Sequence, residues 1–216
     1  MIEYPSIINS SKAPRGHCVA FDKLDGSNFR AKWTQKRGFD TFGTKTQLIN
    51  ESTPLWGHMV TVFRDTLEKD LNKFLKKEFP NEREVITYGE FFGANSFAGR
   101  HQTDELGRFT EQMQIVLFDI LIGHKNRHFV PPLEFSKYDA FPSPRIIYYG
   151  NLNQEFIDDI RANKYGLKEG VVCKGTQKSG AFRGHIWMAK IKTKEYFDKL
   201  YRMFDGNDKE IKKYWE

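Results

Sequence analysis

Cysteine is scarce in this sequence, and long apolar runs are missing from it. The two cysteines, Cys18 and Cys173, lie far apart without His or Cys neighbours at metal-ligand spacing. This argues against a disulfide framework and a structural zinc site. No stretch approaches the roughly 20 apolar residues that span a bilayer, and the first ten residues lack the form of a secretory signal. We therefore expect no membrane association and a cytoplasmic or nuclear-type location, or a viral protein acting in the host cytoplasm.

Internal repeats, low-complexity tracts and flexible linkers are also missing, so one domain over residues 1–216 is expected. The chain is 39% hydrophobic and 15% aromatic, which is enough to fill a core. Its 34 basic and 28 acidic residues are interspersed and give a net charge of +6. This excess favours a polyanionic partner, but on its own it is weak evidence.

Apolar residues alternate with polar ones in several segments, which predicts strands. HCVAFD and SNFRAKWT flank an Asp-Gly dipeptide, which predicts a hairpin-type turn with Lys23 at the edge of a sheet. Four later strands are expected, in VITYGEFFG, QIVLFDILI, EGVVCKG and HIWMAKIK. A polar loop separates the first two of these, and residues 130–144 are expected to form an irregular connection.

Helical spacing is clear in three segments. Apolar residues recur at three- and four-residue steps from Leu55 to Phe79, which predicts a long amphipathic helix with Thr53-Pro54 near its start and Pro80-Asn81 at its stop. Residues 153–163 predict a short helix, and KEYFDKLYRMF predicts a terminal one. Together with the strands, these segments predict an α+β fold.

The tetrapeptide KLDG, at residues 23–26, has two interpretations. Alone it indicates a β-turn with a solvated lysine. A lysine amine is also a covalent nucleophile when its surroundings favour the unprotonated form. Four further signatures follow it in order, each in or beside a predicted strand: TYGEFFG, QIVLFDI, KEGVVCKG and MAKIK. Five signatures in one order are hard to obtain by chance.

This ordered set resembles the covalent nucleotidyltransferase superfamily of DNA ligases, RNA ligases and mRNA capping enzymes. KxDGxN, with Asn28, and the opening EYPSI are similar to the type 2 RNA ligases, whereas DNA ligases usually have KxDGxR. The resemblance runs from about Tyr4 to Lys192. It implies a nucleotidyltransferase (ATP-grasp-like) fold of antiparallel sheets flanked by helices, and a monomeric ATP-dependent ligase for RNA in preference to DNA.

The resemblance also implies roles for particular residues. Lys23 would attack the α-phosphate of ATP and become lysyl-AMP, with Mg²⁺ or Mn²⁺ as the metal. AMP would then pass to a 5′-phosphate, and a 3′-hydroxyl would complete the bond. Lys190 and Lys192 would hold the α-phosphate and help to keep Lys23 unprotonated. The backbone of residues 21–23, including Phe21 and Asp22, would contact adenine.

Other implied roles concern the nucleotide pocket. Asn28 would lie near the phosphate and the reacting nucleic-acid end, and Glu90 would bind the ribose hydroxyls. Phe92 would stack on adenine, Phe118 is a second candidate base contact, and Asp119 would brace the pocket. Glu169 would face the ribose or a metal. Taken singly, these carboxylates and lysines could be solvated surface residues, and the phenylalanines could be core residues.

Two departures from the superfamily stand out. Lys45, in FGTKTQ, stands where an arginine that contacts phosphate is expected, and lysine keeps the charge but loses the bidentate fork. The chain ends at residue 216, 24 residues after Lys192, so no carboxy-terminal OB-fold or helical domain is expected. Nucleic acid would then have to contact a basic surface of this domain. The candidate residues for that surface are Lys32, Lys36, Arg37, Arg100, His101 and Arg108. Alternatively, these six side chains are scattered charges that keep the protein in solution.

Two alternatives to an RNA ligase stay open. One is a DNA ligase or a capping-type guanylyltransferase, although capping enzymes generally use an OB-fold. The other is a nucleic-acid-binding module that keeps the fold without catalysis, against which the intact set of Lys23, Glu90, Glu169, Lys190 and Lys192 argues.

Overall fold

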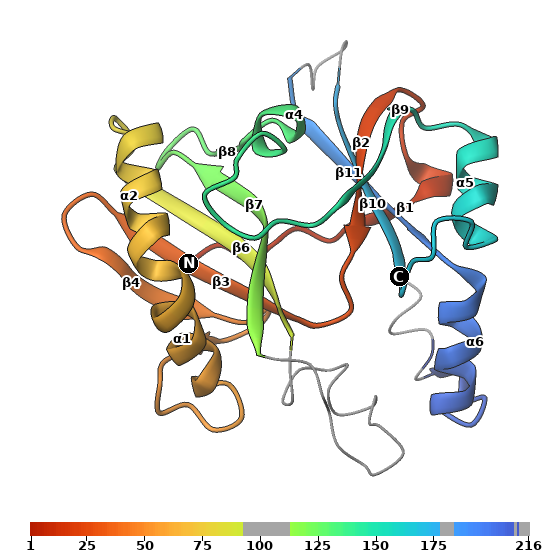
Figure 1. Cartoon of the computed structure of the whole chain (residues 1–216), viewed down its shortest axis with the longest axis horizontal. Helices are drawn as coiled ribbons and strands as arrows, with labels where there is room; N and C mark the ends of the chain where they lie inside the picture. Colours follow the sequence, from red (N-terminus) through yellow and green to blue (C-terminus); the bar gives the residue numbers. More distant parts are fainter. Residues whose placement is uncertain (93–112, 178–183, 210, 212–216) are drawn as a thin grey trace. The chain divides into compact units, whose positions relative to one another are not determined.

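The structure is a computed structural model that describes residues 1–92, 113–177, 184–209 and 211 (Figure 1). Contacts along the chain group it into two compact units, and each unit has its own sheet. The segments of unit 1 are Met1–Tyr4, Asp25–Val130 and Glu134–Ser143. The segments of unit 2 are Pro5–Leu24, Pro131–Leu133 and Pro144–Glu216.

Unit 1 contains a six-stranded sheet in the order β5-β4-β3-β6-β7-β8, with every neighbouring pair antiparallel. Its strands are β3 (Ser27–Thr34), β4 (Gly38–Gly43), β5 (Leu48–Ile49), β6 (Glu84–Phe92), β7 (Gln114–Ile122) and β8 (His128–Phe129). In β3 the apolar side chains of Phe29, Ala31 and Trp33 are buried, and Asn28 and Arg30 alternate with them. The polar pair therefore points to the opposite face of the sheet.

The amphipathic helix of unit 1 covers the apolar face of this sheet. It runs as α1 (Gly57–Phe63), a π-helical segment (Arg64–Glu68) and α2 (Lys69–Glu78) (Figure 1). Phe63 packs on Phe29 at 5.3 Å between ring centroids, and Trp33 Nε1 donates to Asn72 Oδ1 at 2.7 Å. The predicted helix is confirmed, but it begins at Gly57 because Leu55 has a positive φ of 67°.

Unit 2 contains a five-stranded sheet in the order β1-β11-β10-β2-β9. Its strands are β1 (Ile8–Asn9), β2 (His17–Lys23), β9 (Ile146–Asn151), β10 (Gly170–Thr176) and β11 (Ile186–Lys192). All pairs are antiparallel except β1 with β11, which is parallel. The predicted strands EGVVCKG and HIWMAKIK are confirmed as β10 and β11.

Helix α5 (Gln154–Arg161) covers one face of the sheet of unit 2. Its residues Phe156, Ile157 and Ile160 pack with residues of β2, β10 and β11 that include Cys18 and Cys173. The Asn153 side chain caps the helix by accepting a hydrogen bond from the Phe156 amide at 2.8 Å. Both cysteines are free and buried, and the predicted terminal helix is α6 (Lys194–Met203).

The predicted Asp-Gly hairpin is wrong. Strand β2 pairs with β10 and β9, whereas β3 pairs with β4 and β6 in the other sheet. Asp25-Gly26 therefore joins two sheets, because both sides of β2 and both sides of β3 are already paired with other strands. Lys23 ends an inner strand and does not lie on a sheet edge.

Several elements were not predicted from the sequence. Strand β4 was not predicted, and neither were the two-residue strands β1, β5 and β8. Strand β9 begins at Ile146, two residues after the Pro-containing stretch, within which α4 (Pro132–Phe135) forms. The polar loop expected after β6 lies outside the described residues. Among the described helices, none is long and apolar enough to cross a membrane.

Candidate active site

Lys23, Glu169 and Lys192 meet at one end of the sheet of unit 2. Glu169 Oε1 lies 2.9 Å from Lys23 Nζ and 2.9 Å from Lys192 Nζ. The side chains of Glu169 and Lys192 are 4% and 7% exposed, and that of Lys23 is 23% exposed. Two ammonium groups thus share one carboxylate oxygen, which leaves excess positive charge where solvent screens it little.

Gly170 explains why these three side chains meet. In the register of the sheet, Gly170 of β10 lies opposite Lys23 of β2 on one side and opposite Lys192 of β11 on the other. Glu169 directly precedes it. A Cβ on residue 170 would lie 2.0 Å from the Ile191 carbonyl oxygen, and φ is +151°. Only glycine fits between the two lysine-bearing strands at this point.

The same face of this sheet carries Phe21, Lys174 and Lys190. Val172 lies opposite both Phe21 and Lys190, so the period-two alternation places these side chains beside Lys23 and Lys192. Lys174 Nζ lies 5.1 Å from the centroid of the Phe21 ring, and Lys174 is buried. Four lysines therefore share one sheet face, which suits a group of concentrated negative charge such as a polyphosphate.

Lys174 was missed in the sequence. The EGVVCKG signature was predicted to contribute Glu169 alone to the site. The period-two pattern was the available signal, because residues 170, 172 and 174 must share a face.

Opposing influences act on the Glu169 carboxyl group. Burial raises its pKa, but the charges and hydrogen bonds of Lys23 and Lys192 outweigh burial and hold the pKa below its ordinary value. Glu169 is therefore ionised at neutral pH. Its main-chain oxygen accepts a hydrogen bond from Thr193 N at 2.9 Å, which fixes the start of β10 against the end of β11.

Asp22 lies on the other face of β2 from Lys23. Its carboxylate lies 3.5 Å from the guanidinium of Arg145, and its main-chain N–H donates to the Arg145 oxygen at 2.8 Å. Burial raises the pKa of Asp22, and Arg145 opposes that rise. Because this amide is already paired, the predicted backbone contacts to adenine would use other groups of residues 21–23.

Asn28 and Glu90 form a second polar centre, in unit 1. They are opposite each other in β3 and β6, and Glu90 Oε1 accepts a hydrogen bond from the Gly26 amide at 3.1 Å. Asn28 Oδ1 is buried and has no hydrogen-bond partner in the described part of the chain. The structure thus brings the KxDGxN and GEFFG signatures together.

The remaining nucleotide-site predictions also fall in unit 1. Phe92 is half-buried at the end of β6. Phe118 packs edge-on against Tyr4 at 4.9 Å between ring centroids, and Asp119 accepts a hydrogen bond from the Tyr4 hydroxyl. Lys45 is exposed in the turn between β4 and β5. Their contacts with a nucleotide stay predictions.

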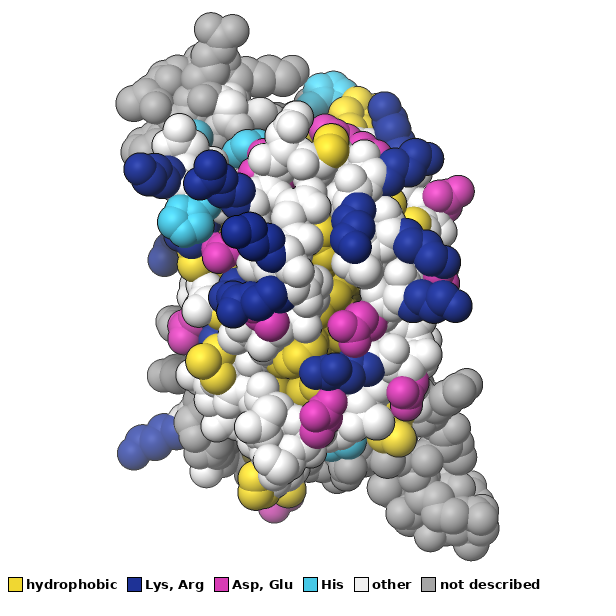
Figure 2. All heavy atoms as spheres, turned by 90° about the vertical axis from the view of Figure 1, so that its left-hand side faces the viewer, with side chains coloured by type: hydrophobic (Ala, Val, Ile, Leu, Met, Phe, Trp, Pro, Cys, Tyr) yellow, Lys and Arg dark blue, Asp and Glu magenta, His cyan; other side chains and the backbone are white. Residues whose placement is uncertain are grey.

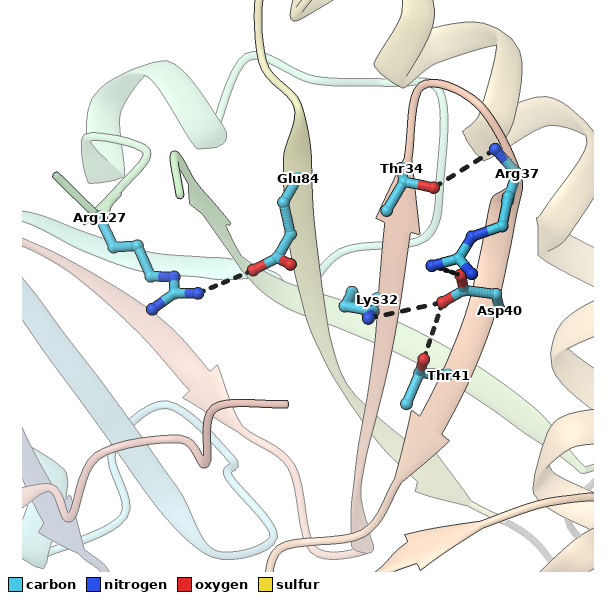
Figure 3. Close-up of polar contacts among 7 residues, drawn as sticks. All are labelled: Lys32, Thr34, Arg37, Asp40, Thr41, Glu84 and Arg127. Carbon is cyan, nitrogen blue, oxygen red and sulfur yellow. Dashed lines mark hydrogen bonds and ion pairs between the residues drawn. The ribbon is translucent and has the colours of Figure 1, made fainter. Parts of the chain in front are cut away.

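Basic side chains are spread widely over the face of the molecule shown in Figure 2, with acidic side chains among them. Of the predicted nucleic-acid contacts, Lys36 and Arg37 are exposed in the turn between β3 and β4. Asp40 pairs with Arg37 at 2.8 Å and with Lys32 at 3.7 Å (Figure 3). Arg100, His101 and Arg108 lie outside the described residues.

The lysine cluster contains one carboxylate that could bind a divalent metal, that of Glu169. No group of three or more His, Cys, Asp or Glu residues able to hold a metal occurs among the residues that the structure describes. Mg²⁺ at phosphate-transfer sites commonly takes one or two protein carboxylates and completes its shell with water and substrate phosphates. Glu169 fits that pattern as the protein ligand.

Solved structures of RNA ligases are similar to this chain in fold. A Naegleria gruberi RNA ligase mutant without ligand has 15% identity and a TM-score of 0.64, covering 93% of this chain and 58% of that one. An archaeal ATP-dependent RNA ligase has 17% identity and a TM-score of 0.60, covering 91% of this chain and 50% of that one. A Naegleria gruberi RNA ligase mutant with AMP and Mn has 15% identity and a TM-score of 0.62, covering 92% and 58%.

At this identity the solved structures show the shared nucleotidyltransferase fold, and this chain spans only 50–58% of their length. No curated protein matches the sequence. The model of the family described as RNA ligase matches residues 16–192, which include the five signatures from KLDG to MAKIK. Because this match covers most of the chain, the protein belongs to the RNA ligase family.

Proposed function

We propose that this protein is an ATP-dependent RNA ligase that works through a covalent lysyl-AMP intermediate. The observation that carries the proposal is the cluster in which Lys23 and Lys192 share one oxygen of the buried Glu169. Lys23 is the most exposed of the three side chains, so its amine is the one that a substrate can reach. The family match supplies the substrate class, RNA.

The first step forms the intermediate. Lys23 Nζ, after losing a proton, attacks the α-phosphorus of ATP. An N–P bond forms, the bond from the α-phosphorus to the bridging oxygen breaks, and pyrophosphate leaves with that electron pair. The nitrogen then releases its second proton to solvent, which gives the phosphoramidate. Lys190, Lys192 and Lys174 share the sheet face of Lys23, so their charges would stabilise the negative charge on the phosphoryl oxygens in the transition state.

Two further steps join the strands. An oxygen of an RNA 5′-phosphate attacks the phosphorus of lysyl-AMP, the P–N bond breaks, and the amine takes up a proton. The terminal 3′-hydroxyl then attacks the 5′-phosphate, loses its proton, and releases AMP. The proposal therefore requires ends with 5′-phosphate and 3′-hydroxyl groups, as in the repair of broken RNA.

ATP and a divalent metal, Mg²⁺ or Mn²⁺, are the proposed cofactors. The solved structures of Naegleria gruberi RNA ligase mutants include one with AMP and Mn and one with ATP and Mn. Glu169 would hold the metal, which would screen the charge of the phosphates. A carboxylate that holds the metal would lose part of its contact with Lys23, and the Lys23 amine would then be available to react.

The test is transfer of label from α-labelled ATP to the protein in the presence of Mg²⁺ or Mn²⁺. We expect an acid-labile, alkali-stable adduct on the wild-type chain, as a phosphoramidate behaves, and none on Lys23→Ala. Lys192→Ala should lower the rate about a hundredfold, as the loss of one fixed donor to a transition state does. Lys164→Ala is the matched control, because Lys164 is an exposed lysine of the same unit, paired with Asp159.

An adduct that persists on Lys23→Ala would overturn the assignment of the nucleophile. Parallel reactions with GTP and NAD separate this activity from that of a capping-type or NAD-dependent enzyme. Nicked RNA, DNA and hybrid duplexes then test the polymer, and faster sealing of DNA than of RNA would contradict the proposed substrate.

A further inference from the structure

Arg30 is a buried cation of unit 1 whose guanidinium is not satisfied. It is 2% exposed, and its Nε and Nη1 atoms have no hydrogen-bond partner among the described residues. Such groups are uncommon, since most buried polar atoms in proteins are hydrogen-bonded. An unpaired buried charge costs far more than an unpaired amide, and arginine cannot avoid this cost by losing its proton.

The neighbouring cations differ from Arg30 in having partners. On β3 and in the turns of the same unit, Lys32 and Arg37 pair with Asp40, and Arg127 pairs with Glu84 at 2.9 Å (Figure 3). The two carboxylates nearest in register, Glu90 and Asp119, bind the Gly26 amide and the Tyr4 hydroxyl. In the part of the chain that the structure describes, no ion pair joins either of them to Arg30.

The fold makes room for this guanidinium. Gly43 lies opposite Arg30 in the sheet, and a Cβ on Gly43 would lie 2.9 Å from Arg30 Nε. On the other side Arg30 lies opposite Tyr88. Burial raises the pKa of Tyr88, and the charge of Arg30 opposes that rise, as expected for close neighbours. A small residue on one side and an aromatic wall on the other keep Arg30 in place.

Asn28 is the next side chain along the same face of β3, and its side-chain NH2 group is a hydrogen-bond donor. A phosphate group would satisfy Arg30, because its oxygens match the planar donor fork of a guanidinium. The Asn28 amide can donate a further hydrogen bond to the same group. Glu90, opposite Asn28, disfavours an anion on its own side and so directs it toward Arg30.

We infer that Arg30, with Asn28 beside it, is a phosphate-binding subsite on the face of the unit 1 sheet opposite Phe29 and Trp33. The inference deepens the proposed function and depends on it for the source of the phosphate. Two sources share this chemistry: the 5′-phosphate end of the RNA and the phosphates of ATP. Arg30 lies outside the KxDGxN signature. It also differs from Lys45, which stands where the superfamily has an arginine that contacts phosphate.

The experiment compares wild type with Arg30→Met, Arg30→Lys and Arg127→Met. Methionine fills similar space without charge, and lysine keeps the charge without the fork. Arg127 is an exposed arginine of the same unit, paired with Glu84, and serves as the control. The first readout is the increase in thermal stability caused by inorganic pyrophosphate. We expect this increase in wild type and Arg127→Met, a smaller one in Arg30→Lys, and none in Arg30→Met.

The second readout identifies the source. If the RNA end is the ligand, wild type binds 5′-phosphorylated RNA about tenfold more tightly than 5′-hydroxyl RNA, and Arg30→Met loses this preference. If ATP is the ligand, Arg30→Met weakens ATP binding about tenfold and leaves adenosine binding unchanged. Either result supports the subsite.

Equal stabilisation of Arg30→Met and wild type by pyrophosphate, with unchanged binding of RNA and ATP, would overturn the inference. Loss of folding in Arg30→Met, with full pyrophosphate stabilisation of Arg30→Lys, would instead make Arg30 a structural residue. The pyrophosphate readout does not require catalysis. It therefore separates failure of this inference from failure of the proposed ligase, which the adduct on Lys23 tests by itself.

Discussion

At the scale of the residue, Glu169 holds two lysines through one oxygen. Its buried carboxylate offsets charges that would otherwise repel each other, while Lys23 keeps enough exposure to meet a substrate. An ion pair of this kind is weak evidence of a stabilising design, because the desolvation of the charges can exceed their attraction. Its value here is geometric, since it fixes where the Lys23 amine lies.

Gly170 is the residue on which this geometry depends most directly. We predict that Gly170→Ala destabilises the protein by about 2 kcal/mol or more, because the new methyl group would meet the Ile191 carbonyl and the backbone conformation disfavours a side chain. Formation of the Lys23 adduct should fall as well, since Glu169 moves with residue 170. Urea unfolding and the label-transfer reaction measure the two effects.

Gly16→Ala is the matched control. A Cβ there has nothing within 4 Å, and Gly16 lies in the same unit, directly before β2. Its stability should stay within about 1 kcal/mol of wild type. Equal stability of both alanine variants would show that the tight contact at residue 170 relaxes without cost.

At the scale of the element, β10 organises the lysine cluster. It lies between β2 and β11 in the sheet, so one strand sets the register of Lys23 on one side and of Lys190 and Lys192 on the other. The turn into α6 completes the arrangement. Thr193 is fully buried and caps α6 by accepting a hydrogen bond from the Tyr196 amide at 3.1 Å.

We predict that Thr193→Val destabilises the protein by about 1 kcal/mol, because it removes the cap and keeps the shape. Thr193→Ser retains the hydroxyl and should stay closer to wild type. Chemical denaturation of both variants gives the comparison. If serine proves the more damaging change, packing of the methyl group outweighs the cap.

The strands that carry the signatures were predictable, because each combines a clear period of two with a distinctive polar residue. The partners of those strands were not. Whether SNFRAKWT pairs with HCVAFD or with VITYGEFFG depends on contacts between residues far apart in the chain, and Asp-Gly is as compatible with a crossing between sheets as with a hairpin. The unpaired state of Arg30 depends on three strands at once, so no local pattern reveals it.

At the scale of the whole molecule, the signatures divide between the two units. Lys23, Glu169 and Lys192 belong to unit 2, and Asn28 and Glu90 belong to unit 1. Residues 23–28 therefore contribute to both, across the link at Asp25. One segment of six residues thus carries the proposed nucleophile, Lys23, in unit 2 and the side-chain amide of Asn28 in unit 1.

The buried Glu169 predicts how global stability depends on pH. The pKa of Glu169 is lower in the folded state than its ordinary value of 4.5. The ionised carboxylate therefore contributes to the free energy of unfolding above pH 4.5, and this contribution is lost as pH falls through the lowered pKa. Glu169→Gln should cost about 3 kcal/mol near neutral pH, since it removes the carboxylate charge that Lys23 and Lys192 share. The difference from wild type should narrow below about pH 4.5. Urea unfolding across this range measures it, and a constant difference would contradict the assignment.

The two-residue strand β1 has a consequence for how the protein is handled. Ile8 and Asn9 pair with Ala189 and Lys190 along β11, so the beginning of the chain covers what would otherwise be an open sheet edge beside the lysine cluster. Open edges recruit strands from other molecules. Shortening the chain past Asn9 would thus leave the KIK signature in place and give it a surface that invites self-association.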